Sequence, residues 1–202
     1  MNPTRPRFGP IPGEELPAGA YVGTCQVHWW VSSGGMSEVY RGVLVGTDEP
    51  VALKVMTREC AFLDVALARF DREVVLLDRL VNLPHIVKAC STGLLDDGIR
   101  RYLITRWIDG EPLSHLIRWN RQNDEDWDPI LATTLIRDIA SALESIHLRK
   151  VVHRDLKPGN IMVERRGHAL YPTLIDFGLS AELDPVSEYA PRRRAAGSRR
   201  RS

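Results

Sequence analysis

The sequence predicts an α+β protein with two lobes: an N-terminal lobe of five antiparallel strands and one helix, and an incomplete, mainly helical C-terminal lobe. Two observations support this fold class. Residues 25–56 contain short β-rich runs separated by turns, whereas apolar residues after position 107 recur at helical spacing. The composition, 44% hydrophobic and 26% charged, is that of a globular chain and excludes wholly disordered and collagen-like structure.

The N-terminal lobe is expected to begin with three strands over residues 25–31, 38–45 and 51–56, separated by glycine-containing turns. A helix follows, because apolar residues from Phe70 to Val81 are spaced by four, three and four residues, and Pro84 is expected to end it. Two more strands, over residues 86–94 and 101–105, complete this lobe. The C-terminal lobe should hold a short helix over residues 113–120 and a long one through residues 131–146.

These elements divide the chain into four segments. Residues 1–19 are rich in proline and predict a flexible leader, and residues 20–106 and 107–190 form the two lobes. Residues 191–202 contain six arginines and predict a disordered basic tail. Such a run of charge is more often simply exposed to solvent than used to bind nucleic acid. Few apolar residues follow position 176, so the second lobe is expected to be unfinished, and the apolar surface left exposed would favour either aggregation or a partner that covers it.

Composition also bears on location. No apolar stretch approaches the ~20 residues of a membrane-spanning helix, and no apolar segment follows Arg5 and Arg7 as in a secretory signal, which predicts a cytoplasmic protein. Cys25, Cys60 and Cys90 are widely spaced, which predicts reduced, buried thiols and disfavours a disulfide framework or a zinc site.

The strongest motif is His-Arg-Asp-Leu-Lys-Pro-Gly-Asn over residues 153–160, directly after the long helix, followed by Asp-Phe-Gly over residues 176–178. A turn-forming aspartate could explain Asp155 or Asp176 alone, but not so many matched positions together. These motifs resemble the eukaryotic-type protein kinase superfamily, and Lys157-Pro158 resembles its serine/threonine branch, with bacterial-like features. The resemblance covers roughly residues 22–180 and predicts a protein-kinase-like bilobal fold, truncated after the Asp-Phe-Gly region.

Two further motifs support the resemblance. Val-Ala-Leu-Lys over residues 51–54 matches the third-strand lysine motif, and residues 69–73 resemble the helix that carries its glutamate partner. On a strand, Lys54 shares one face with Ala52, which directs its ammonium group toward the lobe interface. A solvated strand lysine is the ordinary alternative, but two of the four lysines fall at motif positions. Glu73 lies at the edge of the helix's apolar stripe and is expected to pair with Lys54.

The resemblance implies transfer of the γ-phosphoryl group of ATP to a hydroxyl group of a protein substrate, with Mg²⁺ as cofactor. In that reaction Asp155 would orient or accept the proton of the hydroxyl group, and Lys157 would stabilise charge on the transferred group. Lys54, held by Glu73, would bind phosphate. Asn160 and Asp176 would supply oxygens to Mg²⁺. Arg154 implies pairing with a phosphorylated activation segment, in which Ser180 and Ser187 are candidate acceptors.

The nucleotide site implied by the resemblance draws on both lobes. Its phosphate loop departs from the family, because Ser32 and Ser37 stand where glycines are usual; each is expected to cost up to about 1 kcal/mol of backbone strain and to weaken nucleotide binding. A plain hairpin turn remains an alternative for this loop. Thr105 is small and is expected to leave the back of the pocket open. The expected nucleotide-binding residues are Val31, Gly34, Gly35, Val39, Ala52, Lys54, Thr105, Arg106, Ile108 and Met162.

Two other functions remain open at this point. A catalytically impaired, ATP-binding kinase fragment or pseudokinase-like scaffold would keep the same charged residues but lack support for its catalytic loop. Residues 189–192 are the nearest match to the family's Ala-Pro-Glu motif, and they carry arginine in place of glutamate. A small-molecule phosphotransferase of related fold is disfavoured by Arg154 and Lys157, which favour a protein substrate.

Overall fold

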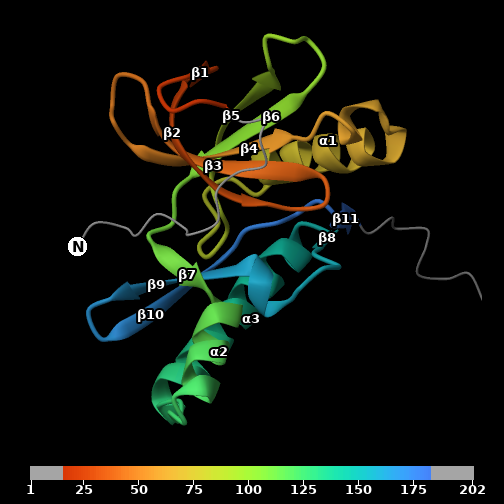
Figure 1. Cartoon of the computed structure of the whole chain (residues 1–202). Helices are drawn as coiled ribbons and strands as arrows, with labels where there is room; N and C mark the ends of the chain where they lie inside the picture. Colours follow the sequence, from red (N-terminus) through yellow and green to blue (C-terminus); the bar gives the residue numbers. More distant parts are fainter. Residues whose placement is uncertain (1–15, 183–202) are drawn as a thin grey trace, which may run out of the picture.

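The N-terminal lobe is a six-stranded antiparallel sheet with one α-helix, in a computed structural model that describes residues 16–182 (Figure 1). The strand order is β1-β2-β3-β4-β6-β5, and the five predicted strands are all present. The sixth, β1, holds two residues, which is too short for the alternation that reveals a strand in sequence. The strands are β1 Tyr21–Val22, β2 Cys25–Ser33, β3 Ser37–Leu44, β4 Pro50–Met56, β5 Ala89–Leu94 and β6 Arg101–Arg106.

Alternation along β4 separates the core of this lobe from its functional face. Val51, Leu53 and Val55 are buried in a cluster that also contains Tyr40 and Ile104. Ala52 and Lys54 therefore emerge on the opposite face and are only partly buried. This face is the one that carries the predicted phosphate-binding lysine.

A short 3₁₀-helix, η1 (Cys60–Phe62), leads into α1 (Asp64–Arg79). The buried side of α1 includes Phe70, Leu77 and Glu73, as the spacing predicts. The helix ends at Arg79, earlier than predicted, and Val81 lies beyond it with 44% of its surface exposed. Asn82 and His85, which precede and follow Pro84, have positive φ angles, so the backbone has already left helical geometry before the next strand.

The described part of the C-terminal lobe combines two helices with short strands, below the larger sheet in Figure 1. Asp128 caps the long helix, because its Oδ1 accepts hydrogen bonds from the backbone N–H groups of Ile130 and Leu131, and Pro129 occupies the first turn. The elements are β7 Gly110–Pro112, α2 Leu113–Gln122, α3 Pro129–Leu148, β8 Val151–Val152, η2 Pro158–Asn160, β9 Ile161–Arg166, β10 Ala169–Leu174 and β11 Ala181–Glu182.

Three short pairings complete this lobe. Strands β10, β9 and β7 form one antiparallel sheet, and β11 pairs with β8. The sheet places β7, which directly follows the connector between the lobes (residues 106–109), against β9, which directly follows the predicted catalytic loop (residues 153–160). The pairing therefore fixes the connector relative to the catalytic loop.

The two lobes share a hydrophobic core. One cluster of buried residues contains Leu77 and Leu103 of the N-terminal lobe together with Ile146 and Phe177 of the C-terminal lobe. The backbone also joins the lobes away from the connector, at a parallel bridge between Ile86 and Leu174. There the N–H of Val87 donates to the carbonyl of Leu174 at 3.0 Å, and the N–H of Leu174 donates to the carbonyl of His85 at 2.8 Å.

Several sequence predictions concern the chain ends and the cysteines. Within the predicted leader, the N–H of Gly19 donates to the carbonyl of Val27 at 2.7 Å, which attaches Gly19 to strand β2. Residues 1–15, the basic tail and Ser187 lie outside the described residues. Cys25 and Cys60 are buried as predicted, but Cys90 is exposed at the edge strand β5. Among residues 16–182, no helix combines the length and apolar character needed to cross a membrane.

Candidate active site

Lys54 and Glu73 form an ion pair between β4 and α1. The Lys54 Nζ donates to both carboxylate oxygens of Glu73, at 2.9 Å to Oε1 and 2.7 Å to Oε2. The Glu73 side chain is only 6% exposed, so the carboxylate is largely removed from water and needs its cation. This confirms the pairing expected from strand alternation and from the helical spacing of Glu73.

Asp176 is a second carboxylate near the same ammonium group. Its Oδ1 lies 3.6 Å from the Lys54 Nζ and accepts a hydrogen bond from the N–H of Gly178 at 3.1 Å. Burial tends to lower the pKa of Lys54, but the carboxylates of Glu73 and Asp176 outweigh it and hold that pKa above its ordinary value. Burial raises the pKa of Glu73, and the contact with Lys54 works against that rise. Lys54 is therefore a fixed positive charge at the lobe interface.

The catalytic-loop residues form a second polar group around Asp155. The Lys157 Nζ donates to the Asp155 Oδ2 at 2.6 Å, and the Asn160 Nδ2 donates to the same oxygen at 2.9 Å and to the Asp155 carbonyl at 3.0 Å. The hydrogen bond from Lys157 is the main cause that lowers the pKa of Asp155. Asp155 is therefore an ionised acceptor at neutral pH.

A main-chain hydrogen bond connects the two polar groups. The N–H of Ile175 donates to the carbonyl of Asn160 at 3.1 Å, which links the catalytic loop to the residue before Asp176. The short 3₁₀-helix η2 presents Asn160 at its end, and Asn160 is buried. The structure thus brings together all the predicted catalytic and metal-binding residues in two linked groups.

His153 and Phe177 pack beneath this site. Their ring centroids are 4.9 Å apart, and both side chains are almost fully buried. The Ser180 hydroxyl donates to the His153 carbonyl at 3.0 Å and is completely buried. The expectation that Ser180 is an available phosphate acceptor is therefore wrong for this conformation, because no kinase could reach its hydroxyl. Arg154, next to His153, is exposed and has a positive φ angle.

The predicted phosphate loop closes the hairpin between β2 and β3. Its tip is held by the N–H of Gly34, which donates to the Ser37 carbonyl at 2.8 Å, and by the N–H of Thr57, which donates to the Met36 carbonyl at 3.0 Å. The Cys60 thiol donates to the Gly35 carbonyl at 3.4 Å.

The strain expected from the missing glycines is absent from this loop. None of its residues has a positive φ angle, and a Cβ atom on Gly35 would meet nothing within 4 Å. Ser32 lies next to the last residue of β2, and Ser37 is the first residue of β3. Serines at these two positions are therefore compatible with the backbone as it stands.

The other predicted nucleotide-binding residues lie on both sides of the interface. Val39 is opposite Lys54, and Ala52 is opposite Thr105, so these four belong to one face of the larger sheet. Val31 is partly buried at the end of β2, and Ile108 is partly buried in the connector, whereas the Arg106 side chain is exposed. Met162 lies in the other lobe, on β9.

Sequence reasoning missed three residues next to this face. The guanidinium carbon of Arg41 lies 4.8 Å from the ring centroid of Trp29 and 5.2 Å from that of Trp107. These residues are far apart in sequence, and the pairing of β2 with β3 contains two irregularities in register, which alternation alone does not reveal.

Comparisons with known proteins agree with this arrangement. Residues 27–199 match the family model described as the protein kinase domain. The chain is 33% identical over 161 residues to the probable serine/threonine-protein kinase PknB of Lactococcus lactis, covering 78% of this chain and 24% of that protein. It is 36% identical over 151 residues to the serine/threonine-protein kinase PknK of Mycobacterium tuberculosis, covering 74% of this chain and 13% of that protein.

The fold is also that of a solved kinase domain. The crystal structure of the Mycobacterium tuberculosis PknI kinase domain is similar with a TM-score of 0.66 and 24% identity, covering 83% of this chain and 65% of that one. The chain spans about a quarter or less of the length of the two curated relatives described above. The sequence match, the fold and the two linked polar groups together show that the chain belongs to the protein kinase domain family.

Proposed function

We propose that the chain is a catalytic part of a serine/threonine protein kinase, which transfers the γ-phosphoryl group of ATP to a hydroxyl group of a protein. One observation carries this proposal. The group of Lys54, Glu73 and Asp176 is joined through the main chain to the group of Asp155, Lys157 and Asn160. Phosphoryl transfer depends on such positioned charges more than on covalent chemistry by the enzyme.

ATP binding follows from the face of the larger sheet. In this proposal Lys54 contacts the phosphates, and the phosphate loop around Gly34 and Gly35 covers them. The adenine lies between the apolar side chains of both lobes, and main-chain groups of the connector at Arg106 and Ile108 recognise its edge. The apolar contacts come from Val31, Val39, Ala52, Thr105 and Met162.

The residues near Lys54 fit a magnesium ion. Mg²⁺ prefers oxygen ligands and is held in such sites by one or two carboxylates together with substrate phosphates. Asp176 offers a carboxylate whose side chain is 42% exposed, and Asn160 offers an amide oxygen because its nitrogen already donates to Asp155. Bound there, the ion would neutralise charge on the phosphates.

The reaction itself is assigned to Asp155 and Lys157. The Asp155 carboxylate accepts a hydrogen bond from the substrate hydroxyl group and orients its oxygen toward the γ-phosphorus. A bond forms between that oxygen and phosphorus, the bond to the bridging oxygen of ADP breaks, and the hydroxyl proton passes to Asp155. Lys157 stabilises negative charge on the transferred group.

The free thiols of Cys25, Cys60 and Cys90 support a cytoplasmic location.

The test is transfer of labelled γ-phosphate from Mg²⁺-ATP to the chain itself or to a general protein acceptor. We expect Asp155→Asn to reduce the rate by about a hundredfold or more, while ATP binding measured by calorimetry persists. Asp97→Asn is the matched control, because Asp97 is a paired aspartate in the turn between β5 and β6, outside the site. Equal rates in Asp155→Asn and the unmodified chain would contradict the proposal, as would ATP binding without transfer by the unmodified chain.

A further inference from the structure

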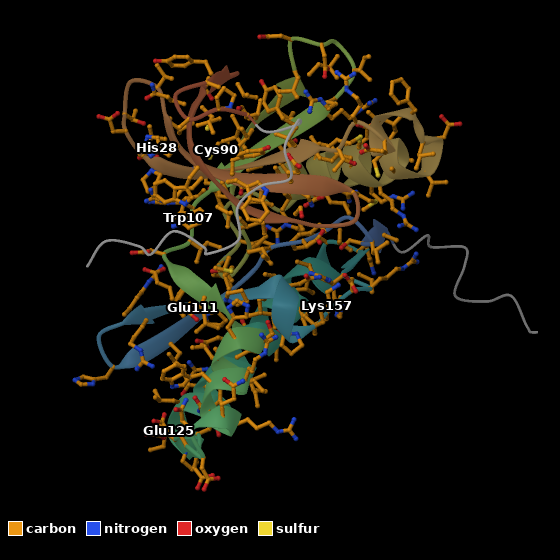
Figure 2. All side chains as sticks on the ribbon, in the orientation of Figure 1. His28, Cys90, Trp107, Glu111, Glu125 and Lys157 are labelled. Atoms are coloured by element: carbon orange, nitrogen blue, oxygen red, sulfur yellow. The ribbon has the colours of Figure 1, made fainter. Side chains whose placement is uncertain are left out.

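The guanidinium group of Arg41, on the inner strand β3 of the larger sheet, lies close to two tryptophan rings. Its central carbon is 4.8 Å from the Trp29 centroid and 5.2 Å from the Trp107 centroid, within the range of cation–π contacts. All three side chains are partly buried, so water screens the contacts less than on an open surface. Figure 2 places Trp107 below His28, between the larger sheet and the lower lobe.

Strand register puts this cluster on the nucleotide-facing side of the sheet. Trp29 is opposite Arg41, Arg41 is opposite Ala52, and Ala52 is opposite Thr105. Directly opposed residues project from the same face of an antiparallel sheet. Arg41 is therefore the immediate neighbour of Ala52 on the face that also carries Lys54.

The cluster makes a direct contact between two parts of the lobe that the sheet joins only indirectly, through β4. Arg41 lies on β3, within the hairpin that carries the phosphate loop, whereas Trp107 directly follows β6 in the connector to the other lobe. Strand β4 lies between β3 and β6, so the hairpin and the connector share no ladder of backbone hydrogen bonds. The connector is itself tied to β4, because the N–H of Trp107 donates to the Pro50 carbonyl at 3.1 Å.

We propose that Arg41 is a positioning residue that holds the hairpin of β2 and β3 against the connector through Trp107, and thereby sets the affinity of the site for ATP. The proposal rests on the proposed function for its nucleotide. The phosphate loop at the tip of the hairpin and the adenine-binding connector lie on either side of the bound nucleotide. A contact that fixes their separation therefore fixes the height of the space that ATP enters.

The chain offers a matched control for the contact. The guanidinium carbon of Arg166 lies 3.7 Å from the Tyr171 ring centroid, a closer contact of the same kind. Arg166 and Tyr171 both belong to the hairpin of β9 and β10 in the other lobe. Removing its charge should therefore affect local packing without moving the phosphate loop.

The first experiment compares steady-state kinetics of Arg41→Gln, Arg41→Lys, Trp107→Leu and Arg166→Gln. We expect Arg41→Gln and Trp107→Leu each to raise the KM for ATP about fivefold, with kcat at saturating ATP within twofold of the unmodified chain. Arg41→Lys keeps a cation, so its KM for ATP should rise less than that of Arg41→Gln. The Arg41→Gln/Trp107→Leu double variant should have a KM for ATP no higher than that of the single variant with the higher KM. An unchanged KM in Arg41→Gln would overturn the proposal, as would an equal rise in Arg166→Gln.

The second experiment measures amide hydrogen exchange without nucleotide, which separates this proposal from the proposed function. In Arg41→Gln we expect faster exchange in residues 29–44 and 106–110 and unchanged exchange in the long helix α3. In Arg166→Gln we expect unchanged exchange in the hairpin of β2 and β3. Exchange that stays the same in the hairpin of Arg41→Gln would overturn the contact's role. If the unmodified chain bound no ATP, the proposed function would fail, while the exchange result would still decide whether Arg41 restrains the hairpin.

Discussion

At the scale of single residues, the buried ion pair of Lys54 and Glu73 makes stability depend on keeping or removing both charges together. The Lys54→Met variant removes the cation but leaves a carboxylate that is only 6% exposed, so we expect the free energy of unfolding to fall by about 3 kcal/mol. The Lys54→Met/Glu73→Leu double variant removes both charges and should recover most of that loss. Urea denaturation measures both, and a double variant less stable than the single one would contradict this prediction.

His153 makes stability depend on pH below neutrality. Burial lowers the pKa of its imidazole, and neither ring nitrogen has a hydrogen-bond partner among the described residues. The unfolded chain, with an ordinary histidine pKa of about 6.5, therefore binds more protons than the folded chain just below that pH. Stability due to His153 is fully present above about pH 6.5 and is lost as the pH falls below it.

The His153→Leu variant tests this reasoning. Because no hydrogen bond to the ring is lost, we expect its free energy of unfolding at pH 7.5 to lie within about 1 kcal/mol of the unmodified chain. Between pH 6.5 and 5 it should lose less stability than the unmodified chain, as measured by urea denaturation at each pH. His168→Leu, at an exposed turn position, is the control, and the same pH dependence in both variants would rule out His153 as the source.

Residue-level prediction from sequence succeeded where one element determines direction. Alternation on β4 was enough to place the Lys54 side chain on the sheet face opposite the core of the N-terminal lobe, and helical spacing was enough to place Glu73 on the inner edge of α1. Burial of Ser180 and the contact of Arg41 with Trp107 depend on segments that meet only in the folded chain. No local pattern marks such residues, so they could be found only in the structure.

At the scale of elements, the close pairing of β7 with β9 depends on Gly110. A Cβ atom there would overlap the Val163 carbonyl oxygen, and a backbone atom cannot move aside as the end of a flexible side chain can. We expect Gly110→Ala to lower the free energy of unfolding by about 2 kcal/mol. Gly35→Ala, at a position with open space, should change it by less than about 0.5 kcal/mol. Equal urea midpoints for the two variants would contradict this prediction.

Element types followed from periodicity, whereas their ends did not. The apolar spacing from Phe70 to Val81 identified α1, but the helix ends at Arg79 because the next segment turns through positive φ angles at Asn82 and His85. The two residues of β1 form a strand only because β2 provides a partner. In both cases the deciding contacts come from other segments, which a one-dimensional pattern cannot contain.

At the scale of the whole molecule, the shared core should make the lobes unfold together. Phe177 is fully buried in the cluster that spans both lobes, so we expect Phe177→Ala to lower the free energy of unfolding by about 4 kcal/mol. Amide exchange should become faster in α1 and α3 alike, because one cooperative unit contains both helices. Faster exchange confined to α3 would show instead that the lobes unfold separately.

The bridge between Ile86 and Leu174 gives the two lobes a second backbone joint in addition to the connector. Two rigid bodies joined at one point can tilt and twist in any direction relative to each other. Joined at two points, they retain easy rotation about the line through both joints, and other rotations must stretch or break hydrogen bonds. The two lobes should therefore move relative to each other mainly by rotation about the line that passes through the connector and the bridge.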